Sequence, residues 1–144
     1  MSAPFPDLSQ PGPIAVTCQC QKVKITIASL PDSANQCQCS LCFKYGVAWG
    51  YFNPDKVTIQ EEPVTLHDPS GQEENDKHFI NYTWKNKDAA FGHCASCGTT
   101  LYWKHTKDGA ARWAQRGKQP TMAVNMKLLG PETLKTIKQE YGYE

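Results

Sequence analysis

The sequence predicts a mainly β fold that is held together by metal, and three observations lead to this prediction. Several short segments alternate apolar and polar residues, the chain holds 10 glycines and 10 prolines, and its 7 cysteines fall into three tight groups. Alternation with a period of two is typical of strands that bury one face, whereas frequent glycine and proline indicate many turns. The 144 residues are enough for one domain with a substantial core.

The clearest strand signal lies in residues 14–28, where Val23, Ile25 and Ile27 alternate with polar residues. A turn at residues 18–20 would make this segment a hairpin with one wet face. Further strands are expected within residues 47–52, 56–60, 77–84, 89–104 and 121–128. The segment 89–104 would form a second hairpin around a C-x-x-C turn.

The other segments are expected to be turns, a loop and one helix. Residues 30–35 and 106–109 have the composition of turns, and residues 61–77 are acidic, polar and interrupted by proline, which favours a loop. Residues 130–144 give the best helix signal, because Pro131 suits a first turn and the apolar residues that follow share one stripe.

The beginning of the chain predicts a flexible arm at residues 1–13, followed by a single zinc domain at 14–144. This arm contains four prolines and lacks the basic start and apolar stretch of a secretory signal. No apolar run approaches the roughly 20 residues that span a bilayer, so we expect a cytoplasmic protein with reduced thiols and no membrane partner. A net charge of +1 argues against a nucleic-acid partner.

The cysteines carry the strongest functional signal. The first group is Cys18 and Cys20, the second is Cys37, Cys39 and Cys42, and the third is Cys94 and Cys97. An odd number of cysteines in a reducing compartment favours metal binding over disulfides. Buried free thiols, or a redox pair in the third group, are the alternatives, although the βαβ context of thioredoxin-like proteins is missing.

Zinc fits this ligand set, because four thiolates around one ion are typical of structural zinc. The first and third groups together supply four sulfurs, and one ion would tie the early hairpin to the late one. The second group offers three sulfurs, and three protein ligands with an exchangeable fourth position are typical of catalytic zinc. The residues alone leave another partition open, in which Cys37 and Cys39 close a site with the third group.

A histidine could instead complete the second group. The candidates are His93, which precedes Cys94, and also His67, His78 and His105. Each of these is more often an ordinary polar residue than a ligand.

Several other side chains are weaker candidates near the second group. Lys44, Arg112 and Arg116 could bind substrate carboxylates, although each is more often a surface charge. Tyr45 and Tyr51 could donate a proton, but aromatic residues near an apolar run are usually core. The four tryptophans, Trp49, Trp84, Trp103 and Trp113, are expected to pack gaps between small sheets. We expect Ser40 to cap a short turn.

The cysteine motifs resemble a known family when they are taken in order. C-x-C at 18–20, C-x-C-S-x-C at 37–42 and F…C-x-x-C-G-T-x-L-Y at 91–102 resemble the glutathione-dependent formaldehyde-activating enzyme (GFA) family, whose domain centromere protein V shares. The resemblance runs from about residue 14 to about residue 128. It implies an Mss4-like fold of small, bent antiparallel sheets tied by zinc, with the predicted helix at the C-terminus.

The resemblance also implies roles for the cysteines. By position, Cys18, Cys20, Cys94 and Cys97 correspond to the family's structural zinc, and Cys37, Cys39 and Cys42 correspond to its catalytic zinc. Two Zn²⁺ ions per chain are therefore expected. One departure is that Gly92 and His93 separate Phe91 from the third group.

The activity implied by the resemblance is that of a carbon–sulfur lyase. The family joins formaldehyde and glutathione into S-hydroxymethylglutathione, so a small thiol or thiol adduct such as a glutathione–aldehyde conjugate is the expected partner. One alternative is a related enzyme of specialised metabolism with a substrate other than glutathione. Another is a non-enzymatic, zinc-stabilised module that binds protein or chromatin. The resemblance leaves a homodimer open.

Overall fold

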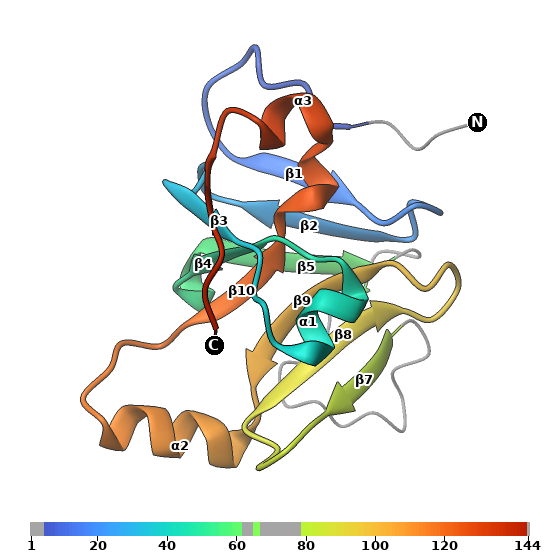
Figure 1. The fold of residues 1–144 in the computed structure, drawn as a ribbon. Helices are drawn as coiled ribbons and strands as arrows, with labels where there is room; N and C mark the ends of the chain where they lie inside the picture. The colour runs from blue at the N-terminus through green and yellow to red at the C-terminus, as the bar shows by residue number, and fades with distance from the viewer. Residues whose placement is uncertain (1–4, 62–64, 67–78, 144) are drawn as a thin grey trace.

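The chain forms two β-sheets with short helices between the strands, as the computed structural model shows (Figure 1). The structure describes residues 5–61, 65–66 and 79–143. Within these ranges most of the regular structure is strand, so the prediction of a mainly β fold is confirmed. The helices there are all too short or too polar to cross a lipid bilayer.

The smaller sheet has four strands in the order β1-β2-β5-β6. Its strands are β1 (Ile14–Thr17), β2 (Val23–Ile27), β5 (Val57–Glu61) and β6 (Thr65–Leu66). The hairpin predicted from alternation is confirmed, because β1 and β2 pair antiparallel with Val16 opposite Ile25. Alternate residues of β2 are buried from Val23 to Ile27, as the period of two requires.

The larger sheet has seven strands in the order β11-β3-β4-β10-β9-β8-β7. Its strands are β3 (Ser33–Asn35), β4 (Trp49–Phe52), β7 (Phe79–Thr83), β8 (Ala89–Cys94), β9 (Thr100–His105), β10 (Met122–Asn125) and β11 (Lys138–Glu140). Neighbouring strands are antiparallel, except that β11 lies parallel to β3. β3 falls within the segment 30–35, which we had expected to be only a turn.

The predicted loop and the strand after it are described only in part. Within residues 61–77 the structure places β6, and residues 62–64 and 67–77 of the segment lie outside the described ranges. The strand expected at 77–84 is β7, at Phe79–Thr83, and its first two residues also lie outside the described ranges.

The C-terminal helix is present but much shorter than the segment 130–144 predicted. It is α3 (Pro131–Leu134), a single turn, and the chain then extends into β11. The side-chain amide of Gln139 donates hydrogen bonds to the carbonyl oxygens of Leu134 and Ile137, at 3.1 and 2.9 Å. The backbone beyond the helix pairs with β3, so tertiary pairing outweighs the helical pattern of the side chains.

The longest helix arises where the sequence predicted a turn at 106–109. This helix is α2 (Lys107–Gln115), and Thr106 caps it by accepting a hydrogen bond from Gly109 N at 3.1 Å. A Cβ atom on Gly109 would lie 2.0 Å from the carbonyl oxygen of Asp88, so the glycine lets the helix approach the β7–β8 connection. The remaining helix, α1 (Ser40–Tyr45), and the 3₁₀ turns Pro54–Lys56 and Met126–Leu129 are short.

The buried residues form two clusters. The larger one joins the two sheets and includes Ile25, Leu101, Tyr102 and Met126. The smaller one surrounds the second cysteine group, and its largest side chains are Trp49, Phe91 and Trp103. The apolar core therefore continues up to the sulfur atoms.

Replacing Gly92 with alanine should destabilise the fold. Gly92 lies in β8, where an added Cβ would meet the ring of the fully buried Tyr102 at 2.3 Å. We expect Gly92→Ala to lower the free energy of unfolding by about 1–3 kcal/mol, measured by urea denaturation of metal-replete protein. Gly142→Ala is the matched control, because its Cβ would make only an ordinary 3.6 Å contact. Equal stability of the two variants would contradict this packing.

Candidate metal centres and the adjoining cleft

Four cysteines that are distant in sequence form the first candidate metal centre. Cys18 and Cys20 lie in the turn after β1, Cys94 ends β8, and Cys97 lies in the turn between β8 and β9. Their sulfur atoms all lie within 4.8 Å of one another. This four-cysteine cluster therefore links the hairpin of the smaller sheet to a hairpin of the larger one.

The sulfur spacing of this cluster suits a tetrahedral ion. The Sγ atoms of Cys18 and Cys20 are 3.6 Å apart, and those of Cys20 and Cys94 are 3.7 Å apart. Zinc–sulfur bonds of about 2.3 Å in a tetrahedron place neighbouring sulfurs about 3.8 Å apart. The cluster can thus hold one metal ion with little rearrangement.

Backbone turns and hydrogen bonds hold the two halves of the cluster together. Gly98 adopts φ 77° and donates its N–H to the carbonyl oxygen of Cys94 at 2.8 Å, which turns the chain back toward β9. The N–H of Gln19 donates to Thr99 Oγ1 at 3.2 Å across the two hairpins. The geometry of the cluster is therefore built into the protein backbone.

The thiols of this cluster differ in how readily they ionise. Burial raises the pKa of Cys18 to about 12 and also raises the pKa of Cys94. Burial acts in the same direction on Cys97, but hydrogen bonds outweigh it, chiefly from Thr99, and lower the pKa of that thiol to about 6. A bound cation removes this difference, because metal coordination deprotonates thiols outright.

The second candidate centre contains Cys37, Cys39 and Cys42, whose sulfurs also lie within 4.8 Å of one another. Cys37 follows β3, Cys39 caps α1, and Cys42 lies in the first turn of that helix. The sulfur of Cys39 accepts a hydrogen bond from Cys42 N at 3.3 Å, so the expectation that Ser40 is the cap is wrong. Ser40 is the first helical residue instead.

No histidine joins this three-cysteine cluster within the ranges that the structure describes. The two ring nitrogens of His93 lie 3.2 Å from Thr100 Oγ1 and 3.2 Å from the hydroxyl of Tyr45. Burial lowers the pKa of His93, which keeps the ring neutral. His105 lies apart from the cluster, and His67 and His78 fall outside the described residues.

A tryptophan supports the three-cysteine cluster from the core side. Trp49 Nε1 donates a hydrogen bond to Cys42 Sγ at 3.3 Å, and both side chains are buried. Such outer contacts orient metal ligands and tune their charge. Burial raises the pKa of the neighbouring Cys39 thiol, but hydrogen bonds from Cys42, Cys37 and Leu41 outweigh burial, so the pKa is lowered overall.

The end of the chain holds the segment that carries this cluster. Gln36 N donates to the carbonyl oxygen of Glu140 at 2.8 Å, and Gln38 N donates to that of Gly142 at 2.8 Å. Gly142 N in turn donates to Asn35 Oδ1 at 2.8 Å. Cys37 therefore lies between two backbone hydrogen bonds to residues about a hundred positions later.

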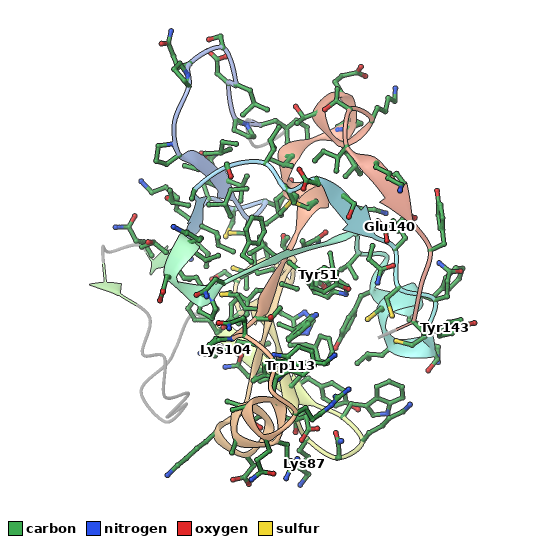
Figure 2. The ribbon with its side chains drawn as sticks, turned by 90° about the vertical axis from the view of Figure 1, so that its left-hand side faces the viewer. Tyr51, Lys87, Lys104, Trp113, Glu140 and Tyr143 are labelled. Carbon is green, nitrogen blue, oxygen red and sulfur yellow. The ribbon has the colours of Figure 1, made fainter. Side chains whose placement is uncertain are left out.

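A cleft of about 620 Å³ opens beside the three-cysteine cluster, with Cys39 and Cys42 in its wall. Five large aromatic side chains line it as well, and they are Tyr51, Trp84, Phe91, Trp103 and Trp113. Figure 2 labels Tyr51 of β4 and Trp113 of α2, which bound the cleft from different elements. The four-cysteine cluster contributes no residue to this cleft.

The structure places some of the polar side chains proposed from the sequence in the cleft wall and others outside it. Arg116 lines the cleft, whereas Lys44 is exposed on α1 outside its wall. Arg112 pairs with the carboxylate of Asp88, to which its Nε donates at 2.7 Å. Tyr51 lines the cleft and interacts with Asn35 through its hydroxyl at 2.9 Å, while Tyr45 packs against Phe91.

Several cleft residues were missed by sequence reasoning as binding candidates, and His105 and Asp88 are two of them. His105 was considered only as a metal ligand, and Asp88 was not considered for binding. They enter the cleft because α2 folds back over the end of β9, and the sequence signal that could have indicated this was the cap Thr106 followed by Asp108.

A mainly β, Mss4-like fold with one four-cysteine and one three-cysteine cluster, each able to bind a metal ion, defines a cysteine-rich metal-binding protein. The model of one family, described as glutathione-dependent formaldehyde-activating enzyme, matches residues 13–128. The chain belongs to this family, as its motifs predicted. The match covers both cysteine clusters.

A solved structure shares the fold. The crystal structure of a Rhodobacter sphaeroides protein from a structural genomics project is similar with a TM-score of 0.60 and 18% sequence identity. The similarity covers 87% of this chain and 98% of that chain. A comparison with curated proteins found no match.

Removing the indole N–H of Trp49 should weaken metal binding at the three-cysteine cluster. We expect Trp49→Phe to lower the affinity of that site by about 10-fold, because Cys42 loses its hydrogen bond while the aromatic packing is largely kept. Chelator competition against each of the two sites measures this. Trp113→Phe is the control, since its indole donates to Gln119 O instead of to sulfur. Equal affinities in both variants would contradict the role of Trp49.

Proposed function

We propose that the protein is a zinc-dependent enzyme of the carbon–sulfur lyase type that acts on a small thiol adduct, such as a glutathione–aldehyde conjugate. The observation that carries this proposal is that the three-cysteine cluster borders a cleft through Cys39 and Cys42. Membership of the family supports the reaction class. We place the enzyme in the cytoplasm, because both clusters need reduced thiols.

The two clusters have different roles in this proposal. The four-cysteine cluster holds a structural zinc, because its four sulfurs complete a tetrahedral shell and join two hairpins. The three-cysteine cluster, Cys37, Cys39 and Cys42, holds the catalytic zinc, with its fourth position available to a substrate. Thiolate ligands favour zinc over harder cations such as magnesium.

The chemistry follows from this ligand set. A metal ion in the three-cysteine cluster would supply an open coordination position that favours the thiolate form of a substrate thiol. In the lyase direction, the hydroxyl proton of the adduct leaves, a carbonyl bond forms, and the carbon–sulfur pair moves to sulfur. Three thiolates carry more negative charge than one Zn²⁺ neutralises, which favours thiol exchange over polarisation of a carbonyl.

The protein groups around the cluster prepare this step. The hydrogen bonds from Trp49 to Cys42, and from the α1 backbone to Cys39, fix two ligands on the side of the helix and core. The aromatic wall of the cleft would limit the access of water to the reacting sulfur.

Metal content tests the two-site arrangement. Purified protein should contain about two zinc ions per chain by elemental analysis, since both clusters are made of thiolates at suitable spacing. A value of one ion per chain in zinc-replete medium would contradict a second site and favour a purely structural metal module.

Two cysteine replacements separate the structural from the catalytic role. Cys18→Ser should unfold the protein, because a structural zinc contributes folding free energy directly. Cys42→Ser should keep the β-rich circular dichroism spectrum and abolish turnover. If both variants unfold alike, the open site loses its support.

The reaction itself is tested with a panel of thiol adducts. Hemithioacetals of glutathione and simpler thiols with formaldehyde and other aldehydes should be converted in a zinc-dependent manner, followed by aldehyde release. Chelator-treated protein, reloaded with zinc, is the control. No conversion across the panel would reject the lyase proposal.

A further inference from the structure

We propose that the electrophilic half of the substrate is an acidic aromatic compound, and not formaldehyde. This inference rests on the proposed function, because it names the substrate class of the same cleft. It is carried by the wall of the cleft and by the charges at its edge.

The wall of the cleft is built to hold a flat ring. Three of the chain's four tryptophans line it, namely Trp84, Trp103 and Trp113. They come from three separate segments, the connection after β7, β9 and α2, so their convergence does not follow from one local apolar run. Formaldehyde has a single carbon atom and would itself contact little of this aromatic surface. Aromatic rings bury large areas against one another and prefer offset-stacked or edge-to-face contacts.

The charge at the edge of the cleft favours an anion. Lys85 and Arg116 both line it and each lies over a tryptophan ring, with Lys85 Nζ 4.5 Å from the centroid of Trp84 and Arg116 Cζ 5.4 Å from that of Trp113. The one acidic residue of the wall, Asp88, is neutralised by Arg112. Neither Lys85 nor Arg116 forms an ion pair within the described ranges. An aromatic acid would meet ring and cation together.

The reaction balances with this substrate. In R–S–CH(OH)–Ar the carbon–sulfur bond breaks with its electron pair on sulfur, the hydroxyl oxygen forms the carbonyl, and the proton moves from oxygen to sulfur. The products are a thiol and an aromatic aldehyde, and nothing is oxidised or reduced. The aromatic ring would lie against the tryptophans of the cleft wall.

The contributions of the ligand's aromatic ring and of its negative charge can be tested separately. Calorimetry measures the binding of three probes to zinc-replete protein in the absence of a thiol. The probes are naphthalene-2-carboxylate, decahydronaphthalene-2-carboxylate, which keeps the charge without the aromatic ring, and naphthalene-2-carboxamide, which keeps the ring without the charge. Naphthalene-2-carboxylate should bind at least about fivefold more tightly than either of the others. Equal affinity for the saturated acid would overturn the aromatic assignment, and equal affinity for the amide would overturn the acidic one.

Amino-acid substitutions test whether naphthalene-2-carboxylate binds in the cleft. Trp84→Leu should weaken naphthalene-2-carboxylate about fivefold, and Arg116→Gln should do so while leaving the amide unchanged. Lys44→Gln is the control, since this residue is exposed and does not line the cleft. Equal losses in control and cleft variants would overturn the proposal.

A second measurement separates failure of this inference from failure of the proposed function. In cobalt-substituted protein, a small thiol such as 2-mercaptoethanol should change the sulfur-to-cobalt absorption of the three-cysteine cluster. A thiol response without aromatic selectivity would overturn only the inference. Absence of any thiol response would reject the proposed function, and the substrate assignment with it. If the protein shows both the thiol response and the aromatic selectivity, it should cleave the hemithioacetal of 4-carboxybenzaldehyde with a kcat/KM at least about 10-fold above that for the hemithioacetal of formaldehyde.

Discussion

The structure depends on the meeting of two hairpin turns at four sulfur atoms. Cys18 and Cys20 come from the smaller sheet, and Cys94 and Cys97 come from the larger one, so a single ion would link both sheets. Buried thiols with raised pKa values, such as Cys18, do not form a stable charged group alone. The arrangement is therefore favourable when a cation compensates the thiolates.

Much of the fold was predictable from local patterns. The alternation of Val23, Ile25 and Ile27 gave β2 correctly, because a strand with one buried face leaves a period of two in the sequence. Two elements escaped this reasoning. α2 begins with a polar stretch that resembles a turn, and its packing against β9 is a tertiary contact. Past Leu134 the helical pattern yields to pairing between β11 and β3, which lie far apart along the chain.

The metal clusters and the cleft differ in how much the sequence could reveal. Spacing within each cysteine group indicates metal binding, because nearby thiolates must approach one ion. The cleft is assembled from residues such as Tyr51, Trp84 and Trp113, which lie on separate elements and which we expected to be core packing. The sequence does not indicate the direction in which a single aromatic side chain points. The role of such residues emerges only when the sheet places them around the sulfur atoms.

The parallel strand at the end of the chain has a consequence for how variation in this protein should be interpreted. Residues 140–142 clamp the backbone on both sides of Cys37, through Gln36, Gln38 and Asn35. A change in the backbone of this tail bears on the position of Cys37 through the residues on either side of it, although the tail lies far from the cysteine motifs in sequence and beyond the matched residues 13–128. The last residues are thus part of the support of the three-cysteine cluster, and not a loose end.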